Sequence, residues 1–145
     1  MKKENTKGGA LTEIIRYGAV GFVSTVIDLG VLKLLTMFSW PYWIALALGF
    51  SSGTVNGYFM NSRWTFKYKT AGSEGIKFSQ FTIVSLIGLG LTELIGNSYM
   101  SIFGADVTIL GKTIGAKMIG KLISVVLVFA WNYLGNKFWT FRRAE

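Results

Sequence analysis

Charged and amide side chains recur inside the long apolar stretches of this sequence. In the last stretch, Lys117, Lys121, Ser124, Asn132 and Asn136 follow one another at helical intervals and lie on one face of a helix. A charge at membrane depth costs about 2.5–3.5 kcal/mol on insertion scales, so each such residue is a functional candidate. Ammonium, hydroxyl and carboxamide groups together favour recognition of an anionic group that carries hydroxyls.

Two carboxylates, Asp28 and Glu93, lie in the first and third apolar stretches. They offer a structural alternative, because two acids and two lysines at similar depth can neutralise one another inside a bundle. We expect Asp28 to pair with a lysine, although it is also a candidate for titration. Lys117 is near the end of its stretch and is expected to reach the membrane surface. For the deeper Lys121, a bound anion and a side chain that reaches the surface both stay open.

A ten-residue phrase occurs twice, each time after an apolar stretch. "GYFMNSRWTF" at 57–66 returns as "NYLGNKFWTF" at 132–141, with the order Tyr-x-x-Asn-x-x-Trp-Thr-Phe in both copies. An aromatic belt at the membrane surface explains the residue types but not their fixed order. An amide one turn from an indole, next to a cation, can bind the sugar and phosphate of a headgroup. The candidates are Asn61, Arg63, Trp64, Asn136 and Trp139.

The composition excludes several classes of protein. Of the 145 residues, 51% are hydrophobic and 15% are charged, whereas soluble domains carry roughly 25% charged residues. Without cysteine or histidine, the chain has no thiolate or imidazole metal ligand and no Ser-His or Cys-His pair. We therefore expect no metal, no cofactor and no enzyme activity. The net charge of +8 comes from residues at the ends of apolar stretches, which indicates membrane topology rather than nucleic-acid binding.

Four stretches are long and apolar enough to predict transmembrane helices, which need about 20 residues each. They cover residues 14–37, 42–61, 78–102 and 113–138. The second carries a strip of small and polar residues suited to close helix packing, namely Gly49, Gly53, Asn56 and Gly57. The first stretch is too long for a cleaved signal peptide. The predicted fold is an all-α membrane protein forming a single domain over residues 1–145.

The two halves of the chain predict a repeat with one orientation. "RYGAVGFVS" at 16–24 corresponds weakly to "QFTIVSLIG" at 80–88, so the chain contains two parallel two-helix repeats. Eleven of the fifteen lysines and arginines, including Arg16 and Arg63, lie near the N-terminus, the central link or the C-terminus. By the positive-inside rule, both termini and the central link are cytoplasmic.

These features resemble the GtrA-like family of small membrane proteins. The resemblance lies in the four spans, the start "RYGAVGFVSTVIDLGVLKLL" and the Asn-x-x-Trp-x-Phe motif that closes the second and fourth spans, and it covers Ile14 to Arg143. The cation differs between the copies, since Ser62-Arg63 stands where the second copy has Lys137-Phe138.

The resemblance implies a multi-pass protein of the cytoplasmic membrane that handles membrane lipids. It implies translocation of a polyprenyl-phosphate-linked sugar of the undecaprenyl type, used to glycosylate O-antigen, teichoic acid or another surface polysaccharide. A polyprenyl-phosphate glycosyltransferase is the implied partner.

Two other functions stay open at this point. The protein could be a non-transporting membrane partner or anchor of the glycosyltransferase, or a small proton-coupled exporter that uses Glu93 or Asp28. The one-sided charge distribution argues against the exporter, since such exporters assemble from oppositely oriented copies. Four helices leave little room for a sealed path, which favours a homodimer.

Overall fold

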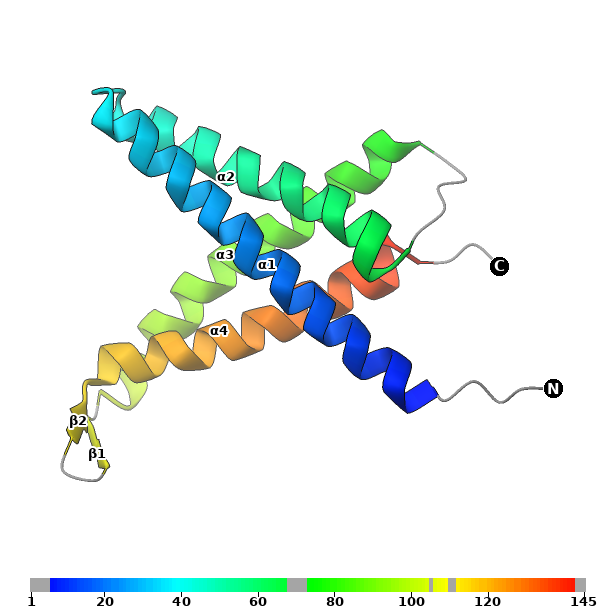
Figure 1. Ribbon diagram of the computed structural model, residues 1–145. Helices are drawn as coiled ribbons and strands as arrows, with labels where there is room; N and C mark the ends of the chain where they lie inside the picture. Colours follow the sequence, from blue (N-terminus) through cyan, green and yellow to red (C-terminus); the bar gives the residue numbers. More distant parts are fainter. Residues whose placement is uncertain (1–5, 68–72, 105, 110–111, 143–145) are drawn as a thin grey trace. The chain divides into compact units, whose positions relative to one another are not determined.

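The computed structural model describes residues 6–67, 73–104, 106–109 and 112–142. Its four α-helices are α1 (Thr6–Met37), α2 (Tyr42–Met60), α3 (Glu74–Ile102) and α4 (Ala116–Gly135). α2 and α4 each continue directly into a five-residue π-helix, η1 (Asn61–Thr65) and η2 (Asn136–Thr140). Figure 1 labels the four helices and the two strands. The chain divides between Phe78 and Ser79 into two compact units.

The first unit is an antiparallel helical hairpin of α1 and α2. A tight connection joins the helices, with Ser39 at a φ of 61° and Pro41 directly before α2. The helices approach closely at Gly53, where a Cβ atom would lie 2.8 Å from the carbonyl oxygen of Ser24. The Asn56 amide donates a hydrogen bond to Ser24 Oγ at 3.0 Å. The predicted small and polar strip of α2 therefore packs against α1.

The second unit pairs α3 with α4 through a short β-hairpin. β1 (Val107–Ile109) and β2 (Lys112–Ile114) are antiparallel, with Thr108 opposite Thr113. The Asp106 carboxylate accepts the Ala116 N–H at 2.7 Å and caps α4. The predicted helix start at residue 113 is therefore wrong, since residues 112–114 pair as a strand.

The apolar stretches form the helices that the sequence predicts. Three helical segments are long and apolar enough to cross a membrane, namely Gly9–Met37, Glu74–Ile102 and Met118–Thr140. α2 has 19 residues, close to the predicted bounds, but its glycines and hydroxyl side chains lower its hydropathy and it falls outside this set. The predicted class, an all-α multi-pass membrane protein, is confirmed, while its orientation stays a prediction.

Candidate functional site

The repeated phrase adopts the same backbone conformation in both units. The Phe66 N–H donates to the Asn61 carbonyl at 2.9 Å, and the Phe141 N–H donates to the Asn136 carbonyl at 2.7 Å. Each hydrogen bond joins residues five positions apart, which is the spacing of a π-helix. We name the two segments the first π-turn (Asn61–Thr65) and the second π-turn (Asn136–Thr140). In both, the asparagine and threonine are buried, whereas Trp64 and Trp139 are 43% and 46% exposed. Such π segments are rare and frequently occur at functional sites.

Each π-turn also meets the preceding odd-numbered helix in the same way. The Tyr17 and Phe66 rings lie 5.9 Å apart at 56°, and the Phe81 and Phe141 rings lie 6.1 Å apart at 57°. Tyr17 and Phe81 occupy equivalent places in the weak correspondence between residues 16–24 and 80–88. The two units are therefore built alike, which supports the predicted repeat.

The polar atoms of the two π-turns differ. In the second, the Thr140 hydroxyl donates to Asn136 Oδ1 at 2.9 Å. In the first, Asn61 Oδ1 and Thr65 Oγ1 are both buried, and neither has a hydrogen-bond partner within the described part of the chain. A buried polar atom without a partner costs about 1–3 kcal/mol. The first π-turn therefore retains hydrogen-bonding capacity that the second has already used.

The cations near the π-turns take up three arrangements. Arg63 is exposed, and its guanidinium lies 5.2 Å from the centre of the Phe59 ring. Lys137 donates to the Tyr133 hydroxyl at 2.9 Å. Arg16 Nη1 donates to the Trp64 carbonyl at 3.4 Å, and its guanidinium carbon lies 5.6 Å from the centre of the Trp64 ring. The sequence does not predict Arg16 as a site residue, and its place directly before Tyr17 is the feature that points to this contact.

The predicted stripe on α4 is spread along the helix. Lys121 is exposed, whereas Ser124 is buried and donates to the Gly120 carbonyl at 2.8 Å. Asn132 lies against Gly88, where a Cβ atom would come within 2.6 Å of its Oδ1. That buried oxygen has no hydrogen-bond partner among the described residues. Lys121 and Asn132 are about 16 Å apart along the axis, so they are successive polar positions rather than one site. The Lys117 side chain lies outside the described residues.

The two carboxylates have different surroundings. Asp28 faces α2, since a Cβ atom at Gly49 would lie 2.6 Å from its Oδ1. That oxygen is buried and has no hydrogen-bond partner within the described residues. Glu93 is exposed on α3. The pairing of Asp28 with a lysine stays a prediction.

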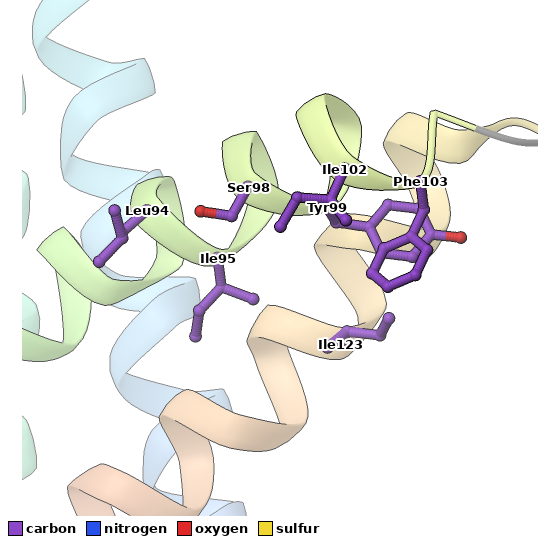
Figure 2. A pocket seen from close by; sticks show the side chains of 7 residues that line it. All are labelled: Leu94, Ile95, Ser98, Tyr99, Ile102, Phe103 and Ile123. Atoms are coloured by element: carbon purple, nitrogen blue, oxygen red, sulfur yellow. The ribbon is translucent and has the colours of Figure 1, made fainter.

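An apolar pocket of about 560 Å³ lies between the end of α3 and the start of α4 (Figure 2). Its lining residues are Leu94, Ile95, Ser98, Tyr99, Ile102, Phe103 and Ile123. Ile123 and Lys121 are about 200° apart around α4, so the pocket and the lysine lie on different sides of that helix. Its apolar lining suits a hydrocarbon chain rather than a charged group.

Comparison with known proteins identifies the family. Residues 16–141 match the family described as GtrA/DPMS, transmembrane domain. YngA, an uncharacterised membrane protein of Bacillus subtilis (strain 168), is 30% identical over 127 residues, which cover 87% of this chain and 77% of that relative. Members of this family are generally non-catalytic membrane proteins. The chain therefore belongs to the GtrA/DPMS transmembrane-domain family, a membership that implies a part in the handling of polyprenyl-phosphate-linked sugars.

Proposed function

We propose that the protein moves a polyprenyl-phosphate-linked sugar of the undecaprenyl type from the cytoplasmic to the outer leaflet of the cytoplasmic membrane. The translocated lipid would supply glycosylation of a cell-surface polysaccharide or teichoic acid. The observation that carries this proposal is the family match over residues 16–141. The substrate's tail can stay in the hydrocarbon, but its phosphate and sugar need polar groups throughout the passage.

Polar side chains along α4 and at both π-turns support this proposal. Lys121 is exposed and would attract the phosphate. Asn132 Oδ1 is an acceptor without a partner in the described structure, and it would accept a sugar hydroxyl. The remaining proposed substrate contacts come from Asn61, Arg63, Trp64, Lys117, Ser124, Asn136 and Trp139.

The energy source and the partners are also part of the proposal. The sequence contains no GxxxxGK[ST] motif for ATP binding. Transport would therefore be passive, coupled to a gradient, or driven by consumption of the lipid on the outer side. A polyprenyl-phosphate glycosyltransferase would load the sugar on the cytoplasmic side, and a second copy of the chain would help enclose the path.

Transport by the purified protein tests the proposal. Liposomes containing it would be loaded with an undecaprenyl-phosphate-linked hexose, and sugar exposure would be followed with an impermeant periodate reagent. We expect Lys121→Ala and Asn132→Ala to slow the movement. The lysine variant should slow it by about tenfold, since a hydrogen bond to a charged group contributes about 1.5 kcal/mol and each 1.4 kcal/mol is a factor of ten.

Lys33→Ala is the matched control, since Lys33 is an exposed lysine on α1 and does not belong to the α4 stripe, and it should leave the rate unchanged. Equal rates for wild type and both α4 variants would remove the stripe from the mechanism. A wild-type protein that does not accelerate the movement, but binds the glycosyltransferase, would instead be its membrane partner or anchor.

A further inference from the structure

We propose that Arg16 and the first π-turn bind the phosphate and sugar of the lipid-linked substrate when it is loaded, and that the second π-turn contacts the substrate only later in its passage. This inference rests on the proposed function. It assigns the loading of the lipid to one unit of a chain whose two units are otherwise built alike.

Arg16 is held in a geometry that leaves it able to bind a phosphate. Its Nη1 donates to the Trp64 carbonyl at 3.4 Å, and the guanidinium lies 5.6 Å from the centre of the Trp64 ring. That hydrogen bond uses one of the five N–H donors of a guanidinium. The remaining donors form the fork that binds phosphate oxygens in pairs. Arg16 itself is only half-buried, so a headgroup can approach it.

The depth of Arg16 matches that of lipid phosphates. Met37 ends α1 next to the tight connection, and Arg16 lies about 31 Å from it along the helix axis. The hydrocarbon core of a bilayer is about 30 Å thick. With the Met37 end at one membrane surface, Arg16 reaches the headgroup level of the other. Trp64 lies at the same level, because Arg16 contacts it directly.

The first π-turn also offers groups for the sugar. Asn61 and Thr65 are 3% and 5% exposed, and Asn61 Oδ1 and Thr65 Oγ1 have no partner within the described residues. Sugar hydroxyls can donate to both oxygens, while the half-exposed Trp64 indole offers a face for the sugar ring. Because both oxygens are covered, the sugar reaches them only after a side chain moves. The phosphate contacts Arg16 without such a change.

The second unit lacks the groups with which the first unit would bind the phosphate and the sugar. Gln80 stands where the first unit has Arg16, directly before the matching aromatic residue, so the position is neutral. The Thr140 hydroxyl is bonded to Asn136, and Lys137 is bonded to Tyr133. In the first unit, Arg63 is directed to Phe59 rather than to Trp64. These differences assign the phosphate to Arg16 rather than to Arg63 or Lys137.

A binding experiment tests this assignment separately from transport. The full-length chain would be placed in phosphatidylcholine nanodiscs, and its affinity for an undecaprenyl-phosphate-linked hexose would be measured. We expect Arg16→Gln, which copies the second unit, to weaken binding by about tenfold or more. Arg16→Lys keeps the positive charge but loses the paired N–H donors of the guanidinium, so its affinity should lie between those of the wild type and Arg16→Gln. Lys33→Gln, which removes an exposed lysine elsewhere on α1, is the matched control and should bind as the wild type does, and Arg63→Gln should weaken binding less than Arg16→Gln does.

Wild-type affinity in Arg16→Gln, or an equal loss in Arg63→Gln, would overturn the assignment. Circular dichroism and the melting temperature would establish that the variants are folded. If Arg16→Gln does not fold, Arg16→Lys decides, and an unchanged affinity in that variant overturns the site. Phosphatidylglycerol at the same mole fraction should not displace the probe. Equal displacement would mean that the site binds any anionic phospholipid rather than the lipid-linked sugar.

The outcomes of the two experiments are distinguishable. Binding that depends on Arg16, in a protein that does not accelerate transbilayer movement, would refute the proposed translocation and leave the site standing. Rapid movement with binding that is independent of Arg16 would refute the site and leave translocation standing.

Discussion

Thr65 and Thr140 occupy the same place in the two repeats but have different surroundings. The Thr140 hydroxyl donates to Asn136 Oδ1 at 2.9 Å, whereas Thr65 Oγ1 has no partner in the part of the chain that the structure describes. Both side chains are buried. The same threonine substitution therefore removes a hydrogen bond at Thr140 but none at Thr65, so the Thr65 variant serves as the control.

We expect Thr140→Val to lower the free energy of unfolding by about 1 kcal/mol or more, because it removes the donor to a buried carboxamide oxygen. Thr65→Val should be neutral or slightly stabilising, since it removes a buried hydroxyl that has no partner. Reversible unfolding in detergent micelles would measure both changes. An equal loss in the two variants would show that the hydroxyl of Thr140 has no special role.

At the residue scale, the sequence identified part of the candidate site. The fixed order of the repeat pointed to Asn61, Trp64, Asn136 and Trp139, and the structure places these four residues in two matching π-turns. The contact of Arg16 with Trp64 could not be predicted, since it joins residues 48 positions apart through the packing of two helices. Which asparagine has a hydrogen-bond partner also depends on side-chain packing, which identical motifs do not reveal.

At the scale of elements, close approach of the two backbones holds the α1–α2 hairpin together. In a membrane, apolar side chains gain little from leaving lipid, so small residues that admit close packing become more important. Gly53 faces the Ser24 carbonyl at a place where a Cβ atom would lie 2.8 Å away, whereas Gly30 on α1 has no heavy atom within 4 Å of that position. The two glycines differ in the room that they leave for a methyl group.

Gly53→Ala should therefore destabilise the first unit by about 1–3 kcal/mol, because α1 and α2 must separate to admit the methyl group. Gly30→Ala should be neutral or stabilising, since alanine favours a helix by up to about 1 kcal/mol over glycine. Melting temperatures of the two purified variants would test this. A lower melting temperature for Gly30→Ala than for Gly53→Ala would contradict the packing described here.

Hydropathy predicted the long elements well and the short ones poorly. The apolar stretches located all four helices because a span of about 20 residues gives a strong signal. The strands 107–109 and 112–114 are three residues each, too short to show a strand period. The π-turns were also missed, because they differ from an α-helix in backbone hydrogen bonding and not in side-chain pattern. Pro41 did mark the start of α2.

At the scale of the whole molecule, the charge distribution predicts a single orientation in the membrane. The absence of cysteine makes this directly testable with single cysteines. Ser73, in the central link, and Thr108, in the β-hairpin, are both exposed. In intact cells, Thr108→Cys should react with an impermeant maleimide, and Ser73→Cys should react only after the membrane is permeabilised. The reverse pattern would overturn the orientation, and equal labelling of both would mean that the chain inserts in two orientations.

The membrane class and the repeat could be predicted from composition and from the doubled phrase. The function could not be derived in the same way, because polar residues inside a membrane serve packing as well as binding. Ser124 illustrates this, since it lies on the predicted stripe but bonds to its own helix. The family match over residues 16–141 was needed to assign the class of substrate.

Each π-helix adds one residue to a helical turn, and the helix continues without a break. Successive α-helical residues are 100° apart, so the addition rotates everything beyond it by about that angle. The widened turns thus determine the direction in which the chain leaves α2 and α4. Deleting a single residue between Asn61 and Thr65 would barely shorten the helix, but it would rotate Phe66 away from the side on which its ring contacts Tyr17.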